Sequence, residues 1–225
     1  MVMKNLVIAL PGREFSGSFI TNWSKTLITL IQKGYKVRLI NEYSSFVPFS
    51  RMKTLGLDVL RGADQKPFNG KSDYDVWLTI DSDIFFTPEN IIELVEDTDK
   101  YPVVSGLYRM TDLKHYAAVK EWDMDQFKKS GTFDFLKVED TDTFEKYMKV
   151  AYNGMGFFAC RKGVIEDLKY PYFSYPLIEM ETEDGTVLRD MCSEDVAFCK
   201  NLTDAGYEVI VNTSLRVGHE KTLVI

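Results

Sequence analysis

Four short apolar segments alternate with amphipathic segments over the first 110 residues, and this order constrains the fold more than any other feature. The apolar segments, which we expect to be strands, are Leu6–Leu10, Tyr35–Ile40, Val76–Ile80 and Val103–Tyr108. Between the first two, up to Gly34, apolar residues recur at helical spacing: Phe19, Trp23, Leu27, Leu30 and Ile31. Because parallel strands require crossover helices, this order predicts an α/β fold with a mostly parallel central sheet flanked by helices.

Helix-start and helix-stop residues predict three further helices. The expected spans, each from its cap to its stop or last apolar residue, are Ser50 to Gly62, Thr87–Pro88 to Val95, and Ser193 to Gly206. Residues 111–150 mix aromatic and charged side chains and predict a smaller antiparallel excursion from the sheet. The remaining expected elements are strands at Gly156–Ala159 and Glu208–Val211 and a short helix at Arg161–Leu168.

Composition limits the class of protein. A length of 225 residues fits one domain, and no apolar run approaches the roughly 20 residues of a membrane span. A net charge of -7 argues against a nucleic-acid polymer as partner. The cysteines are odd in number and form no Cys-x-x-Cys pair, so we expect reduced thiols in a cytoplasm at Cys160, Cys192 and Cys199.

Two carboxylates, Asp81 and Asp83, directly follow the strand Val76–Ile80. The carboxyl ends of strands in an open α/β sheet are where ligands bind, and oxygen ligands suit Mg²⁺ or Mn²⁺ that also contact substrate phosphates. The pair therefore predicts a divalent metal site. The alternative is that both residues only cap the turn that follows, as aspartate often does.

A second acidic pair, Glu194 and Asp195, follows the helix cap Ser193. It could be a catalytic pair, or it could only complement the dipole of the helix. Near the C-terminus, His219 offers an imidazole to a metal and Lys221 offers a cation to a phosphate.

The order of these motifs resembles that of the nucleotide-sugar-dependent glycosyltransferases of the GT-A fold, in compact single-domain members of viral or bacterial type. The matching segments run nearly end to end: Pro11-Gly12-Arg13 after the first strand, IDSDI at 80–84, NGMGFFACRKGVIEDLKYPYF from Asn153, SEDVAFC from Ser193 and VGHEK from Val217. The resemblance implies one domain, with a nucleotide-sugar-binding half at 1–110 and an acceptor-binding and catalytic half at 111–225. For a viral member it implies the host cytoplasm.

The resemblance also implies an activity: metal-dependent transfer of a sugar from a nucleotide diphosphate sugar, with a UDP-sugar expected, to a hydroxyl of a glycan or other acceptor. Mn²⁺ or Mg²⁺ would be held by Asp83, Asp81 and His219. The catalytic pair would be Asp195, as base of an inverting reaction, and Glu194; a retaining reaction would leave Asp195 a binding role. Lys221 would pair with a phosphate.

Binding residues follow from the same motifs. Those implied for the donor are Pro11, Gly12, Arg13, Asn41, Glu42, Arg51, Asp81, Ser82 and Lys221. Those implied for the acceptor are Asn153, Gly154, Gly156, Glu194 and Trp122. Aromatic platforms for sugar faces are expected among Trp122, Tyr152, Tyr172 and Phe173, although aromatic side chains more often belong to a core.

Rival functions remain open. A non-catalytic module of the same fold could hold a nucleotide sugar or glycan. A haloacid-dehalogenase-like phosphatase would use Asp81 as nucleophile, but its motif follows the first strand. A sugar nucleotidyltransferase would need a glycine-rich, basic loop where Ala9–Glu14 stands, and a calcium loop of EF-hand type would need glycine at its sixth position.

Overall fold

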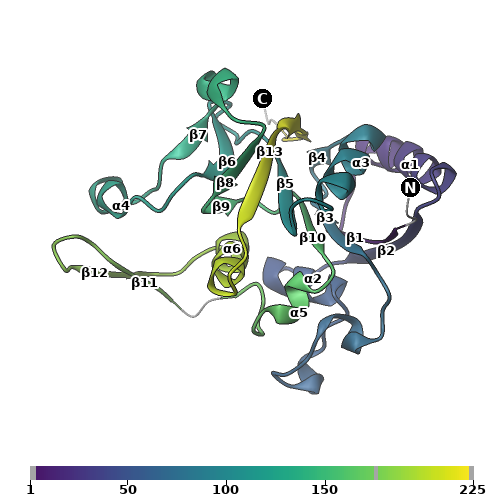
Figure 1. The fold of residues 1–225 in the computed structure, drawn as a ribbon, viewed down its shortest axis with the longest axis horizontal. Coiled ribbons are helices and arrows are strands. Elements are labelled where there is room, and N and C mark those ends of the chain that lie inside the picture. Colours follow the sequence, from purple (N-terminus) through teal and green to yellow (C-terminus); the bar gives the residue numbers. More distant parts are fainter. Residues whose placement is uncertain (1–3, 175–176, 223–225) are drawn as a thin grey trace.

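A seven-stranded sheet forms the centre of the molecule in the computed structural model, which describes residues 4–174 and 177–222 (Figure 1). The strand order is β2-β1-β3-β10-β5-β13-β8. The strands are β1 (Asn5–Pro11), β2 (Lys36–Glu42), β3 (Val76–Ile80), β5 (Val103–Leu107), β8 (Tyr147–Val150), β10 (Phe157–Arg161) and β13 (Val209–Arg216). All except β10 and β8 run in one direction, which confirms the predicted mostly parallel sheet.

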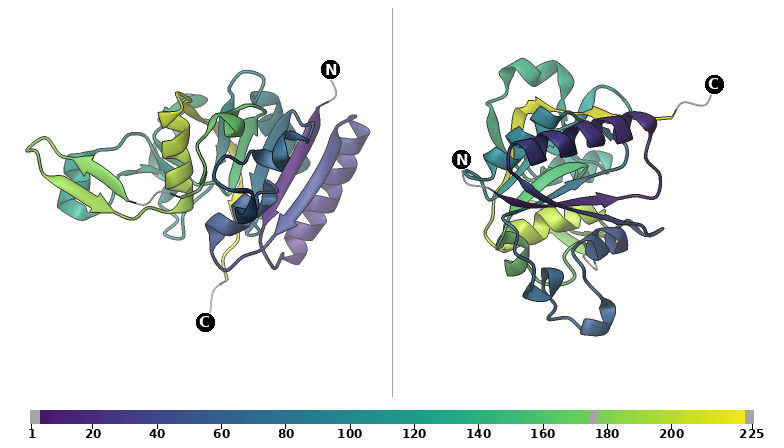
Figure 2. Two further views of the ribbon diagram at one scale, coloured as in Figure 1. Left: turned by 90° about the horizontal axis from the view of Figure 1, so that it is seen from below. Right: turned by 90° about the vertical axis from the view of Figure 1, so that its right-hand side faces the viewer.

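Helices cover both faces of this sheet, as the right-hand view of Figure 2 shows for α1 and α6. One face packs against α1 (Gly17–Gln32) and α3 (Pro88–Asp97). The other packs against α2 (Val47–Thr54), α5 (Val164–Asp167) and α6 (Glu194–Asp204). Alternate residues of the buried strands enter the two cores, so that Val7 and Trp77 face one side while Ile8 and Leu78 face the other.

The smaller antiparallel part predicted for the second half is confirmed. One small sheet contains β6 (His115–Val119), β7 (Phe135–Lys137) and β9 (Tyr152–Asn153), all paired antiparallel. A hairpin of β11 (Ile178–Glu181) and β12 (Val187–Asp190) projects beside α4 (Met124–Ser130) in Figure 1. Short 3-10 turns lie at Val59–Arg61, Pro67–Gly70 and Val138–Thr143.

Capping signals were a good guide at α3 and a poor one at α2. Thr87 accepts a hydrogen bond from the Asn90 amide, and the Asn90 side chain accepts one from the Thr87 amide, while Pro88 opens α3 as predicted. The predicted Ser50 cap is wrong. That residue lies inside α2, which begins at Val47 beside Pro48, and its hydroxyl donates to the Glu42 carbonyl. A proline near the first helical turn explains the earlier start.

Other expectations need smaller corrections. Ile31 of α1 is 59% exposed and does not belong to the core. Ser193 stands at the N-cap of α6, but its side chain makes no capping hydrogen bond. The helix predicted at Arg161–Leu168 is the shorter α5, because Arg161 still belongs to β10. The three cysteines are free, as expected. None of the helices in residues 4–174 and 177–222 combines the length and apolar character needed to cross a bilayer.

Two strand pairings bring distant segments to one sheet edge. The reversed direction of β10 places its first residue, Phe157, opposite Ile80 at the end of β3, and the Asp81 amide donates to the Gly156 carbonyl at 2.9 Å. In addition, β4 (Ile84–Phe85) pairs with β14 (Gly218–His219). The chain from Asp81 to Phe85 is therefore fixed between the segment before β10 and the C-terminal segment.

Candidate active site

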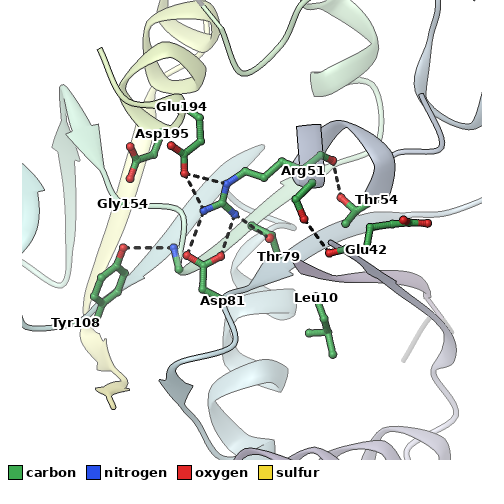
Figure 3. A network of polar contacts seen from close by, with 12 residues as sticks. Leu10, Glu42, Arg51, Thr54, Thr79, Asp81, Tyr108, Gly154, Glu194 and Asp195 are labelled. Atoms are coloured by element: carbon green, nitrogen blue, oxygen red, sulfur yellow. Dashed lines mark hydrogen bonds and ion pairs between the residues drawn. The ribbon is translucent and has the colours of Figure 1, made fainter. Parts of the chain in front are cut away.

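A buried guanidinium links the two acidic motifs. Arg51 of α2 is 2% exposed and binds Asp81 with both ends of its fork, at 3.0 Å from Nη1 to Oδ1 and 3.1 Å from Nη2 to Oδ2. Its Nη2 also lies 3.3 Å from Oε1 of Glu194 (Figure 3). Burial lowers the pKa of Arg51, but the charges of Asp81 and Glu194 outweigh burial and raise it. Arg51 therefore stays charged and pairs with one carboxylate of each motif.

Asp83 has different partners from Asp81. Its Oδ2 lies 2.5 Å from Nζ of Lys221 and 3.2 Å from Nε2 of His219. Burial tends to raise the pKa of Asp83, but the hydrogen bonds and charges of those two residues lower it to about 2. The backbone holds this group together, because the Glu220 amide donates to the Asp83 carbonyl at 2.7 Å.

The hydrogen bonds of His219 define what Asp83 faces. Nδ1 lies 2.8 Å from the Arg109 carbonyl, which can only accept, so Nδ1 carries a hydrogen. In the doubly protonated ring Nε2 donates to the Asp83 carboxylate, whereas in the neutral ring Nε2 is an acceptor that faces it. When neither carries a proton, His219 Nε2 and Asp83 Oδ2 repel each other at 3.2 Å unless a cation lies close to them. The Lys221 ammonium, which contacts the same Asp83 oxygen, is such a cation.

The predicted metal ligands are brought together only in part. Asp83 and His219 converge, and an oxygen and a nitrogen donor suit a divalent cation that keeps water or phosphate as its other ligands. Asp81 does not share their partners, since Arg51 binds both of its oxygens. Within the described residues no group of three or more His, Cys, Asp or Glu side chains is arranged to hold a metal ion.

Asp195 has hydroxyl partners. Tyr152 donates to Oδ2 at 3.2 Å, and Ser193 donates to Oδ1. Burial first, and then the Asp195 charge, raise the pKa of Tyr152, so Tyr152 remains a donor. In the part of the chain that the structure describes, Asp195 forms no ion pair. The neighbouring Glu194 has a raised pKa, because burial and the Asp195 charge outweigh Arg51.

Most predicted donor residues lie together at the ends of β1, β2 and β3. The Asn41 side chain donates to the carbonyls of Leu10 and Gly12, at 2.7 and 2.9 Å. A β-carbon on Gly12 would lie 2.8 Å from Cβ of Ser82, so only glycine allows this close approach.

The other predicted donor residues lie close by. Pro11 ends β1 beside Glu42, which ends β2, while the Arg13 guanidinium lies 5.9 Å from the ring centre of Tyr43. Arg51 is the exception, since its described partners are Asp81, Thr79 and Glu194.

The predicted acceptor residues separate into two groups. Asn153, Gly154 and Gly156 are buried, and a β-carbon on Gly154 would lie 2.0 Å from the Tyr108 hydroxyl. That hydroxyl accepts a hydrogen bond from the Gly156 amide at 3.3 Å. Their burial favours a supporting role behind the site over the direct acceptor contact that the sequence predicted.

The other group lines a cavity. Trp122 lines a cavity of about 460 Å³ together with Tyr152, which was expected as a platform for a sugar face. By contrast, Tyr172 and Phe173 are core residues with 0% and 1% exposure, so they are not sugar platforms. The sequence did not predict the contact of Tyr108 with the Gly156 amide, or the hydrogen bond from Tyr152 to Asp195. The two glycines at 154 and 156 were the available signal, since paired glycines often mark a close approach.

Comparisons with known proteins show similarity of fold. No protein-family model and no curated protein matches the sequence. The crystal structure of A197 from STIV is similar with 15% sequence identity and a TM-score of 0.52, over 99% of this chain and 97% of that one. The structure of GalNAc-T7 with UDP, GalNAc and Mn²⁺ is similar with 10% identity and a TM-score of 0.50, over 98% of this chain and 44% of that one. The α/β fold is therefore GT-A-like, a fold shared with glycosyltransferases.

Proposed function

We propose that this protein is a metal-dependent glycosyltransferase that moves a sugar from a nucleotide diphosphate sugar, with UDP as the expected nucleotide, to a hydroxyl of a glycan or other acceptor. The supporting observation is the division of four carboxylates at one edge of a GT-A-like sheet. Arg51 pairs with Asp81 and Glu194, while Asp83 faces His219 and Lys221 and Asp195 faces hydroxyls. Asp83 and Asp195 are thus not bound by Arg51, and we assign them to the metal and to the base respectively.

Asp83 and His219 are the residues that we propose to hold Mn²⁺ or Mg²⁺. Such a cation, when bound, would neutralise the charge that develops on the diphosphate leaving group. Lys221 is close enough to Asp83 to reach the same phosphates once the carboxylate has another cation. Asp81 then acts indirectly: it holds Arg51, and through its backbone amide it holds the segment before β10.

Asp195 is the proposed base. Its oxygen would take the proton of the acceptor hydroxyl while the acceptor oxygen forms the new bond to the anomeric carbon. The bond from that carbon to the phosphate oxygen breaks, and the nucleoside diphosphate leaves with the electron pair. Tyr152 and Ser193 orient the carboxylate, and Glu194 is less suited as base because Arg51 engages it.

The proposed donor site is the group formed by Pro11, Gly12, Asn41 and Ser82 at the sheet edge. Small residues with their carbonyls and amides at strand ends suit a base and ribose. The two-sided pairing of Asp81 with Arg51 also argues against the phosphatase alternative, in which Asp81 would have to be a free nucleophile.

A thermal-shift panel with UDP, UDP-sugars and Mn²⁺ tests the proposal. A ligand that binds only the folded state raises its stability by about 2.7 kcal/mol at a concentration a hundredfold above Kd. We expect UDP together with Mn²⁺ to raise Tm by more than the sum of either alone. Release of UDP from a UDP-sugar, dependent on Mn²⁺, separates an enzyme from a binding module. No shift with any nucleotide would exclude the proposed function.

A further inference from the structure

Four parts of the second half of the chain line the cavity of about 460 Å³. Its walls come from α4, from the sheet of β6, β7 and β9, from the hairpin of β11 and β12, and from the start of α6. An ion pair between Lys128 of α4 and Asp184 of the hairpin joins two of these walls. Figure 1 shows both elements extending from the same side of the central sheet.

The aromatic walls of the cavity do not belong to the protein core. Trp122, Phe127, Phe133 and Phe135 are only partly buried, and none of them is a member of either buried apolar cluster of the described residues. They contact each other instead: the rings of Phe127 and Phe133 are stacked at 4.7 Å, and Trp122 meets Phe133 edge-on at 4.8 Å. Apolar surface that is gathered but left open to solvent favours burial by a ligand.

The cavity is continuous with the surroundings of the proposed base. Tyr152 and Ser193 both line the cavity, and both donate hydrogen bonds to Asp195. A molecule that fills the cavity would therefore have one end close to the carboxylate that we propose to remove a proton.

We propose that this cavity binds an apolar, ring-containing part of the acceptor and so places the acceptor hydroxyl near Asp195. The inference rests on the proposed function and specifies its acceptor class. A sugar ring needs several hydrogen bonds, whereas the lining is mainly aromatic and aliphatic, with charged side chains confined to Glu179, Asp190 and Lys200. A cavity of this volume lies in the range that encloses a small organic group.

Calorimetric titration with two glucosides tests the proposal without any donor. The probes are 2-naphthyl β-D-glucoside, which carries a fused aromatic group, and methyl β-D-glucoside, which does not. Burial of an aromatic group gives an expected Kd at least about tenfold lower for the naphthyl compound. Phe133→Ala should remove most of that preference. Phe46→Ala is the matched control, since Phe46 is an exposed aromatic residue outside the cavity, at the N-cap position of α2.

A second variant guards against a folding defect in Phe133→Ala. Met191 lines the cavity but is 78% exposed, so Met191→Glu should fold normally and weaken naphthyl binding by placing a charge at the cavity. Equal affinity for both probes, or a naphthyl preference that survives both variants, would overturn the proposal. A different result would also overturn the proposal: light scattering shows a dimer of the wild-type protein, Met191→Glu dissociates that dimer, and the wild-type protein has no preference for the naphthyl compound.

The same variants distinguish this inference from the proposed function. The stabilisation by UDP and Mn²⁺ depends on the donor side and should be unchanged in Phe133→Ala and Met191→Glu. If UDP and Mn²⁺ do not stabilise the wild-type protein, the proposed transferase function is rejected, whatever the naphthyl titration shows. A normal UDP shift without a naphthyl preference would reject only the acceptor class.

Discussion

The two acidic pairs, Asp81 with Asp83 and Glu194 with Asp195, look alike in the sequence but differ in their partners. One member of each pair is bound by the same buried guanidinium of Arg51. The other members diverge: Asp83 faces the nitrogens of His219 and Lys221, and Asp195 faces two hydroxyls. Neighbours, and not spacing along the chain, therefore distinguish the two members of each pair.

Removal of the shared cation should have the largest effect. In Arg51→Met, Asp81 and Glu194 would face each other with no neutralising charge, which costs about 3 kcal/mol or more in unfolding free energy. Urea denaturation measures this loss. The control is Arg13→Met, at an exposed position, where a change within about 0.5 kcal/mol is expected. A loss below about 1 kcal/mol in Arg51→Met would show that the two pairs are not coupled through Arg51.

Substitution of the second carboxylate of α6 should affect catalysis instead of stability. Loss of a general base lowers a rate by about 10²- to 10⁴-fold, so we expect that decrease in kcat for Asp195→Asn and less than about tenfold for Glu194→Gln. Sugar transfer with a saturating donor measures both rates. The UDP shift should persist in both variants. Equal losses would break the distinction between the two residues.

The affinity for Mn²⁺ should depend on Asp83. Asp83→Asn removes the negative charge of the carboxylate that faces His219, and we expect the apparent Kd for Mn²⁺, from thermal shifts in the presence of UDP, to rise at least about tenfold. Asp73→Asn, an exposed carboxylate on the loop before β3, is the control and should leave the affinity unchanged. An unchanged affinity in Asp83→Asn would assign the cation to other residues.

The smallest expected effect is a pH dependence at Glu194. Its pKa is raised by burial and by Asp195, so the carboxyl group favours folding below its ordinary pKa of 4.5 and loses that contribution as pH rises through the raised value. Glutamine cannot titrate. The Tm of Glu194→Gln minus that of wild type should therefore be more positive at pH 7 than at pH 4. A difference that becomes more negative over this interval would contradict the raised pKa.

The sequence predicted the elements better than the contacts. The strand Val76–Ile80 is observed as predicted, because a short apolar run that ends in polar residues is typical of a buried strand. Thr87 with Pro88 opens α3 as predicted, because capping depends only on neighbouring residues. The predicted start of α2 is wrong because Pro48, and not Ser50, marks the first turn of the helix.

The partners in the site are the part that could not be predicted. Arg51 meets Asp81 and Glu194 across 30 and 143 residues of chain, and no local pattern encodes such contacts. The motif order did predict that Asp83 and His219 lie together, and the antiparallel pairing of β4 with β14 is what brings them there.

The reversed strand β10 also has a consequence for synthesis of the chain. It lies between β3 and β5, although it follows them by many residues, and β13 then completes the sheet beside β5. A fragment that ends before β10 would leave β3 and β5 as separate, unpaired edges. Residues 1–110 can therefore not complete their sheet during translation until the segment from β6 to β10 has left the ribosome.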